Sequence, residues 1–150
     1  MTIALNPTTV SASIAALSIT GVTIKDIDAI PDSAQNLCPV IIPQTEFITD
    51  IQPERKSFGS GGAEKIDFQY TLNYWFLFCE VGSGINAFAP YEGLIQKLDL
   101  ILETILTNDT VSGLVDLQLQ NIGRIGTIQD ASENMYWGCS FSVRCLEYAE

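Results

Sequence analysis

The chain has no histidine, and it has only seven lysine and arginine residues against 18 aspartates and glutamates, a net charge of −11. A serine nucleophile would therefore have no imidazole to serve as its general base. A positive face for nucleic-acid phosphates or anionic lipid is equally missing. No apolar run approaches the roughly 18 residues of a membrane-spanning helix. These absences do not exclude a protein that lines a channel with acidic side chains, through which DNA moves without binding.

Cysteine is scarce as well, with four residues and no pair at Cys-x-x-Cys spacing. Three of them, Cys79, Cys139 and Cys145, lie within apolar strand patterns, and the fourth is Cys38. We expect four reduced thiols that pack as small hydrophobic groups. A zinc site would need all four cysteines at irregular spacing, because histidine ligands are absent. We therefore expect no metal.

Two short motifs invite a ligand-binding interpretation and do not support it. The glycine-rich run 59–62 has no following Lys-Ser or Lys-Thr and leads into a strand, whereas a phosphate loop opens a helix. The acidic stretch from Asp26 has Pro31 and Leu37 where a calcium-binding EF-hand loop needs glycine and glutamate. We predict no catalytic residue and no cofactor, although two carboxylates can still meet in space from distant positions.

Residues 65–79 carry the most informative pattern in the chain. Apolar residues from Ile66 to Tyr74 alternate with polar ones, as in a strand with one dry and one wet face. From Tyr74 the alternation stops, and positions 75–79 are all apolar. Such a strand needs cover on both faces, and in so small a chain we expect a second chain to supply part of it. Trp75 is accordingly a predicted interface residue.

The remaining pattern predicts one domain over residues 1–150. A short helix is expected from Thr8 or Thr9 to about Leu17, and a longer one from Pro90 to Leu106. Leu100 and Leu106 fall outside the apolar stripe of the longer helix, which indicates a second contact. Further strands are predicted at 38–43, 45–51, 115–120, 122–128 and 135–146. The fold class is therefore α+β: a mixed, mostly antiparallel sheet packed by a long central helix and a short N-terminal helix.

Between two predicted strands lies a flexible tip at about 53–64, rich in glycine and flanked by basic residues. The tip lacks side chains for a core, so we expect it to become ordered by contact with an acidic neighbour or near DNA. The predicted interface residues here are Arg55, Lys56, Phe58 and Gly59, in addition to Trp75. A solvated loop with scattered charges is the simpler alternative.

The order of these elements resembles the tail-terminator, or tail-completion, proteins of long-tailed bacteriophages. The resemblance covers the early helix, the strand pair joined by the tip at 54–64, the aromatic strand 68–78, the helix 91–106 and the last strand 135–146. It rests on pattern and size, without a short signature motif. It implies a hexameric ring at the head-proximal end of the tail tube, which ends tube growth and joins the tail to the head connector.

The same resemblance implies the partners and the location. They are further copies of the chain, the tail-tube protein and the head–tail connector proteins. Genomic DNA would pass the lumen without specific binding, since an acidic lumen repels phosphates. The chain would belong to the virion, assembled in the host cytoplasm, with no membrane and no enzymatic activity. The alternatives are another phage neck or tail-tube subunit, a stand-alone small-molecule or peptide-binding α+β domain, and an enzyme that uses carboxylates or a cysteine.

Overall fold

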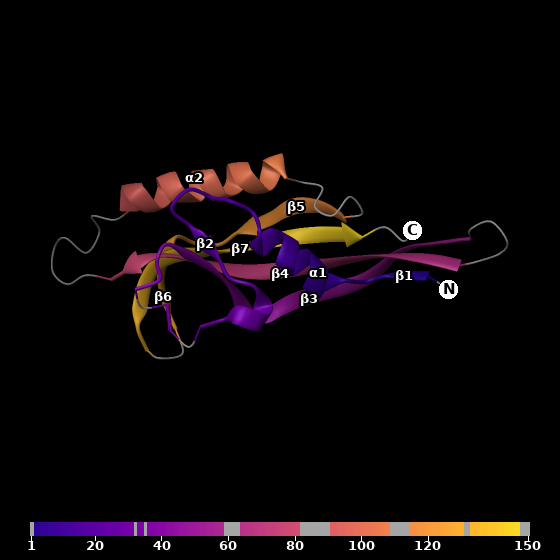
Figure 1. Ribbon diagram of the computed structural model, residues 1–150, viewed down its shortest axis with the longest axis horizontal. Coiled ribbons are helices and arrows are strands. Elements are labelled where there is room, and N and C mark those ends of the chain that lie inside the picture. The colour runs from indigo at the N-terminus through magenta and orange to yellow at the C-terminus, as the bar shows by residue number, and fades with distance from the viewer. Residues whose placement is uncertain are drawn as a thin grey trace.

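A computed structural model shows one elongated sheet with two α-helices (Figure 1). It describes residues 2–31, 33–34, 36–58, 64–81, 91–108, 115–130 and 133–147. The helices are α1 (Pro7–Ala15) and α2 (Tyr91–Thr107), with a 3-10 turn η1 (Ile27–Ala29). The strands are β1 (Thr2–Ala4), β2 (Thr23–Ile24), β3 (Val40–Phe58), β4 (Glu64–Glu80), β5 (Val115–Ile122), β6 (Gly126–Gln129) and β7 (Met135–Glu147).

The sheet is mixed and mostly antiparallel, in the order β2-β3-β4-β7-β5. β4 lies in the middle and pairs with β3 on one side and β7 on the other, both antiparallel. The two short N-terminal strands are parallel additions, β1 on β4 and β2 on β3, and β6 pairs with the first residues of β7. The predicted α+β class and the predicted mostly antiparallel sheet are confirmed at this level.

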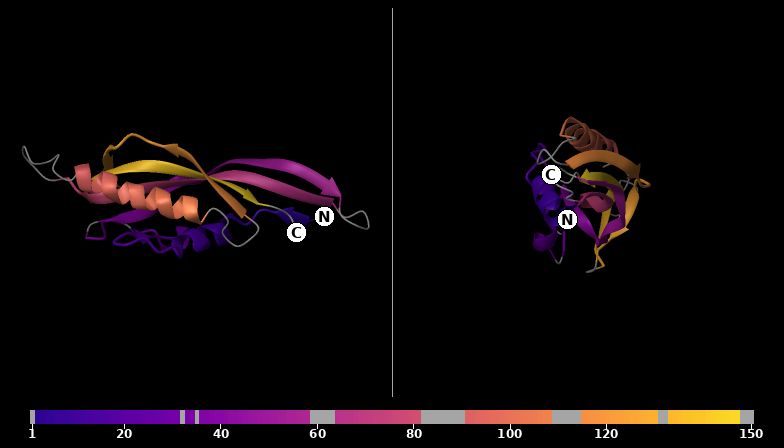
Figure 2. Two further views of the ribbon diagram at one scale, coloured as in Figure 1. Left: turned by 90° about the horizontal axis from the view of Figure 1, so that it is seen from above. Right: turned by 90° about the vertical axis from the view of Figure 1, so that its right-hand side faces the viewer.

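The predicted helix at 90–106 is present as α2 (Tyr91–Thr107), but it is not a long central helix. α2 has 17 residues and lies on the outside of one face of the sheet (Figures 1 and 2). Its predicted apolar stripe is largely correct, because Leu94, Leu98, Ile101 and Ile105 are buried against the sheet. Ile95, whose spacing from Leu98 and Leu102 would place it within that stripe, is instead exposed. A 17-residue helix about 25 Å long covers only part of so long a sheet, and the core forms beneath it.

α1 begins earlier and ends earlier than predicted. Pro7 is its first residue and Asn6 its N-cap, so neither Thr8 nor Thr9 caps it. Proline is favoured in the first turn because its missing N–H would have no partner there. The buried carboxylate of Glu147 accepts a hydrogen bond of 2.6 Å from the Asn6 backbone N–H, which ties this helix end to the end of β7. A contact 141 residues away has thus replaced the local cap that the sequence suggested.

β3 is one irregular strand where the sequence predicted two. Its pairing with β4 is interrupted by register shifts between Pro43 and Ile48, between Thr49 and Gln52, and between Pro53 and Arg55. These bulges let a strand containing two prolines follow β4 along its whole length. The predicted tip at 53–64 is therefore too long, because 53–58 and 64 belong to strands and only 59–63 lie outside the described residues.

The other predicted strands are close to those observed. β7 alternates largely as expected, with Trp137, Cys139, Phe141, Val143 and Cys145 buried against the helices. At its start Met135 is exposed and Tyr136 is buried, the reverse of the expected pattern. The predicted strand 122–128 is shorter, because β5 continues to Ile122 and β6 comprises only four residues.

The pair β3–β4 projects beyond the rest of the sheet at one end of the molecule (Figures 1 and 2). We call residues 53–58 and 64–67 the arm. Within it Arg55 pairs with Asp67 and Lys56 with Ile66 in the antiparallel ladder, and β1 runs parallel to β4 from Lys65 to Asp67. The arm is therefore a strand extension whose backbone is paired on both sides of β4.

Candidate functional site

The face of the sheet opposite the helices, here called the outer face, has its own small apolar cluster. It consists of Ala34, Val40, Ile42, Leu77 and Tyr136, with Cys38, Trp75 and Ile128 packed at its margin. The expectation that a second chain covers the all-apolar part of β4 is therefore wrong for Leu77, which is 1% exposed within one chain. The segment before β3, which includes Ala34 and Cys38, folds back over this face and covers Leu77.

Trp75 differs from Leu77, since it is only half-buried at the edge of this cluster. It lines a cleft of about 140 Å³ on the outer face. Ile30, Ile42 and Leu77 form the apolar part of the wall, and Asp130 adds a carboxylate. We call this site the Trp75 cleft. On the outer face of β4, Leu77 is thus fully buried, whereas part of the Trp75 indole ring remains exposed and available to a partner.

The Asp130 carboxylate is held in place by its neighbours. Tyr136 donates its hydroxyl to Oδ2 at 2.9 Å, and Ser33 donates to the same oxygen at 3.3 Å. The Asn134 backbone N–H donates to Oδ1 at 2.9 Å. Burial and this hydrogen bond to a carboxylate raise the pKa of Tyr136, so its hydroxyl stays a donor at neutral pH. Asp130 therefore presents a fixed acidic group to the cleft.

Further along the outer face the side chains are polar, and we call Thr49, Thr71, Asn73, Gln120 and Ser142 the polar patch. Asn73 donates to the Phe47 carbonyl at 3.3 Å and to the Thr49 hydroxyl at 2.9 Å, and it accepts from Ser142 at 2.8 Å. Thr71 donates to Gln120 at 2.9 Å. The patch lines an open depression of about 390 Å³. Within the patch the neutral side chains bond to one another, and Asp50 and Asn121 complete the lining of the depression.

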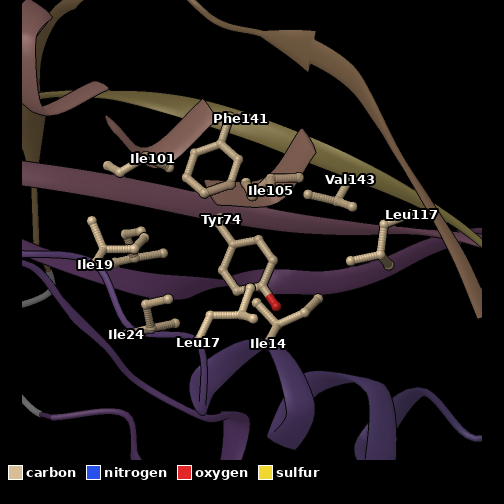
Figure 3. A pocket seen from close by; sticks show the side chains of 11 residues that line it. Ile14, Leu17, Ile19, Ile24, Tyr74, Ile101, Ile105, Leu117, Phe141 and Val143 are labelled. Atoms are coloured by element: carbon tan, nitrogen blue, oxygen red, sulfur yellow. The ribbon is translucent and has the colours of Figure 1, made fainter. Parts of the chain in front are cut away.

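On the helix side, a small gap lies between the two helices and the sheet (Figure 3). Figure 3 shows the Tyr74 ring in its middle, surrounded by aliphatic side chains from both helices and from β5 and β7. The gap measures about 10 Å³, which is about the room that one water needs. Burial raises the pKa of Tyr74, and its hydroxyl makes no hydrogen bond of normal geometry within the described part of the chain. This is a packing gap with no room for a substrate.

The predicted interface residues do not form one site within a single chain. Arg55, Lys56 and Phe58 occupy positions on β3 within the arm, and Gly59 lies outside the described residues. Trp75 lies in the wider part of the sheet, beside the segment that precedes β3. The sequence analysis did not identify Asp130, Tyr136 and Ser33. Pairing of β6 with β7 brings Asp130 and Tyr136 together, and Ser33 joins them from 97 residues away. The turn-forming residues near Asp130 were the only available hint.

Nothing in the described ranges gathers three or more metal-binding side chains. All four cysteines are free thiols; Cys139 and Cys145 are buried, as predicted, whereas Cys38 and Cys79 are only half-buried. Burial raises the pKa of Cys139 to about 11 and that of Cys145 to about 12. Such thiols stay protonated at neutral pH, where a nucleophile or metal ligand must be a thiolate. Within the described ranges, neither helix has the length and apolar character required to cross a bilayer.

Comparison of the sequence with models of known protein families finds no match, and a search of curated proteins finds none either.

Proposed function

We propose that this chain is a structural virion protein that forms a ring at the head-proximal end of a phage tail tube. The ring would end tube growth and join the tail to the head connector, with genomic DNA passing through its lumen. The proposal follows from the resemblance in element order, and the geometry of the sheet supports it. No step in it requires a catalytic residue, a metal or a cofactor.

The observation that carries the proposal is the polar patch on an outer face that no helix covers. Asn73, Thr71 and Ser142 make that part of the face wet and hydrogen-bonded through neutral side chains, and the whole chain has a charge of −11. Arg144 lies beside Thr71 on the same face and donates to Gln69, so the repulsion of DNA phosphates would come from the net negative charge of the whole ring. Helices on the other face would then form the outside of the ring.

The sheet also has two edges at which copies can join. Among the described residues, β3 beyond Ile42 pairs only with β4, and β5 pairs only with β7. Each edge strand carries an exposed isoleucine, Ile51 on β3 and Ile122 on β5. Two different edges joined head to tail make a heterologous interface, which produces a ring when the rotation closes.

Light scattering of the purified chain tests the proposal. We expect about six times the 16.4 kDa of one chain, and a ring with a central hole by electron microscopy. Ile51→Lys places a charge on an edge strand and should prevent ring formation. Ile95→Lys is the matched control, an exposed isoleucine on α2, and should leave the ring intact. A chain that neither forms a ring alone nor assembles onto isolated tails would contradict the proposal.

Another neck or tail-tube subunit is the related alternative. Adding the purified chain to tails that lack their terminator separates the two: a terminator restores head joining, whereas a tube subunit lengthens the tails. The Trp75 cleft favours a second alternative, a stand-alone small-molecule or peptide-binding domain. Such a domain would remain a monomer or dimer and would not join heads to tails.

A further inference from the structure

The charges of this chain are unevenly distributed. Residues 53–67, which include the arm, hold three of the seven basic residues and three of the 18 acidic ones. The rest of the chain therefore has four basic residues against 15 acidic ones, and it carries the entire net charge of −11. The arm has no net charge, so, unlike the body, it is not repelled as a whole by the acidic body of a neighbouring copy, and its cationic side chains can be attracted to carboxylates there.

The residues that line the Trp75 cleft are suited to bind a lysine or arginine side chain. Its indole ring is half-buried, its floor is aliphatic through Ile42 and Leu77, and the Asp130 carboxylate stands at its polar side. Arginine and lysine combine an aliphatic stem with a cationic head. The stem suits the aliphatic floor, and the head suits both the face of an indole ring and a carboxylate oxygen.

The arm cannot reach the cleft of its own chain. The arm projects from one end of the elongated sheet. β6, which ends at Gln129 immediately before Asp130, lies toward the other end (Figures 1 and 2). Two complementary surfaces at opposite ends of one molecule join copies head to tail, and each copy both gives and receives the contact.

We propose that the Trp75 cleft binds a basic side chain, Arg55 or Lys56, from the arm of a second copy of this chain. The inference rests on the proposed ring function and names the contact that fixes neighbouring subunits. Asp130 holds its hydrogen bonds to Tyr136 and Asn134 while it meets the incoming cation, because a carboxylate accepts several hydrogen bonds. Trp75 covers the stem and excludes water from the pair.

A pair of charge-matched variants tests the contact through the mass of the assembly. Arg55→Glu/Lys56→Glu reverses both arm cations, whereas Lys25→Glu/Arg124→Glu makes the same change of net charge on the body. We expect the arm variant to lose assembly at concentrations where the body variant still assembles. Equal behaviour of the two variants would overturn the proposal, since general repulsion would then explain the loss.

Trp75 supplies a second readout, which does not depend on ring closure. The difference between the emission of the full chain and that of Trp75→Phe isolates Trp75 from Trp137. This difference spectrum should shift to shorter wavelength as protein concentration rises, and the shift should be absent in the arm variant. Asp130→Asn keeps an acceptor for Tyr136 and removes the charge, so half-maximal shift should need about two- to fivefold more protein. Circular dichroism verifies that each variant is folded.

The two readouts separate this inference from the proposed function. A sixfold mass with an unchanged Trp75 spectrum leaves the ring standing and overturns the arm–cleft contact. A Trp75 shift in an assembly that is not a ring sustains the contact and overturns the ring. A chain that is monomeric at every concentration, with a constant spectrum, overturns the contact.

Discussion

The two faces of β4 are built from alternate residues of one strand, yet they are stabilised in different ways. On the helix side, Leu72, Tyr74 and Phe76 are at most 1% exposed and pack beneath α1 and α2. On the outer face, Asn73 belongs to the polar patch, Trp75 to the cleft and Leu77 to the small apolar cluster. One face is uniformly dry, and the other changes from wet to dry within five residues.

The two faces also differ in how well their polar groups are hydrogen-bonded. The outer face is wetter, but Asn73 uses both its amide nitrogen and its amide oxygen in hydrogen bonds to neighbours. The helix side is drier, and there the Tyr74 hydroxyl points into an aliphatic gap (Figure 3). A buried polar group without a partner costs free energy, whereas a paired one contributes. The drier face therefore contains the less favourable polar group.

The largest expected effect comes from a matched pair of leucines on the two faces. Leu72→Ala on the helix side and Leu77→Ala on the outer face should each lower the free energy of unfolding by about 2–5 kcal/mol. The reason is that both side chains are at most 1% exposed. Urea denaturation measures both values. A cost below about 1 kcal/mol for Leu77 alone would mean that the outer cluster is loosely packed and needs a partner chain.

The next effect concerns the close approach of β7 to β4. A Cβ at Gly138 would lie 1.9 Å from the Phe76 carbonyl oxygen, so the two strands would have to separate. Gly138→Ala should destabilise the chain by about 1–3 kcal/mol or more. Gly126→Ala is the control, because its nearest neighbour would be Arg124 Nε at 4.0 Å. Thermal unfolding of the two variants should differ clearly, and equal midpoints would show that the strands adjust.

A smaller loss is expected from the polar patch. Asn73→Ala removes a side chain that bridges β3 and β7 and leaves the Ser142 hydroxyl without its acceptor, a cost of about 1–2 kcal/mol. Gln118→Ala, at an exposed position on β5, serves as the comparison and should change stability by less than about 0.5 kcal/mol. If the two substitutions cost the same, the hydrogen bonds of the patch contribute nothing beyond those to water.

The smallest effect is expected at Tyr74. Tyr74→Phe keeps the ring, which packs against Phe47 and Phe141, and removes only the hydroxyl. Stability should stay the same or rise by up to about 1 kcal/mol, because no hydrogen bond of normal geometry is lost. Chemical denaturation of this variant beside Asn73→Ala compares the two faces directly. A loss above about 1 kcal/mol would place an ordered water or another partner at the hydroxyl.

Several features followed from the sequence because they depend on local periodicity. The alternation in β4, β5 and β7 identified their helix-side residues, and the apolar stripe identified the buried residues of α2. Buried free thiols were expected from the apolar surroundings of Cys139 and Cys145. Such patterns are reliable because a strand or helix repeats its exposure at a fixed interval, whatever it packs against.

Other predictions failed where contacts distant in the chain decided the outcome. Glycines at 59–62 suggested a long tip, but pairing with β4 extends β3 through Phe58. Proline and irregular alternation suggested two strands where bulges preserve one. The apolar run from Trp75 indicated a second cover correctly, but it could not indicate that the cover at Leu77 is the same chain.

The sequence by itself thus determined which residues of each strand are apolar, where α2 is buried, and that the chain is acidic and without histidine. Periodicity and composition are properties of neighbouring residues, so they can be known before folding. Only the tertiary structure decided that Asp130 and Trp75 line one cleft, that Glu147 meets the start of α1, and that the arm and the cleft lie at opposite ends. Those placements depend on strand order and register, which are set by pairing and packing between segments far apart in the chain.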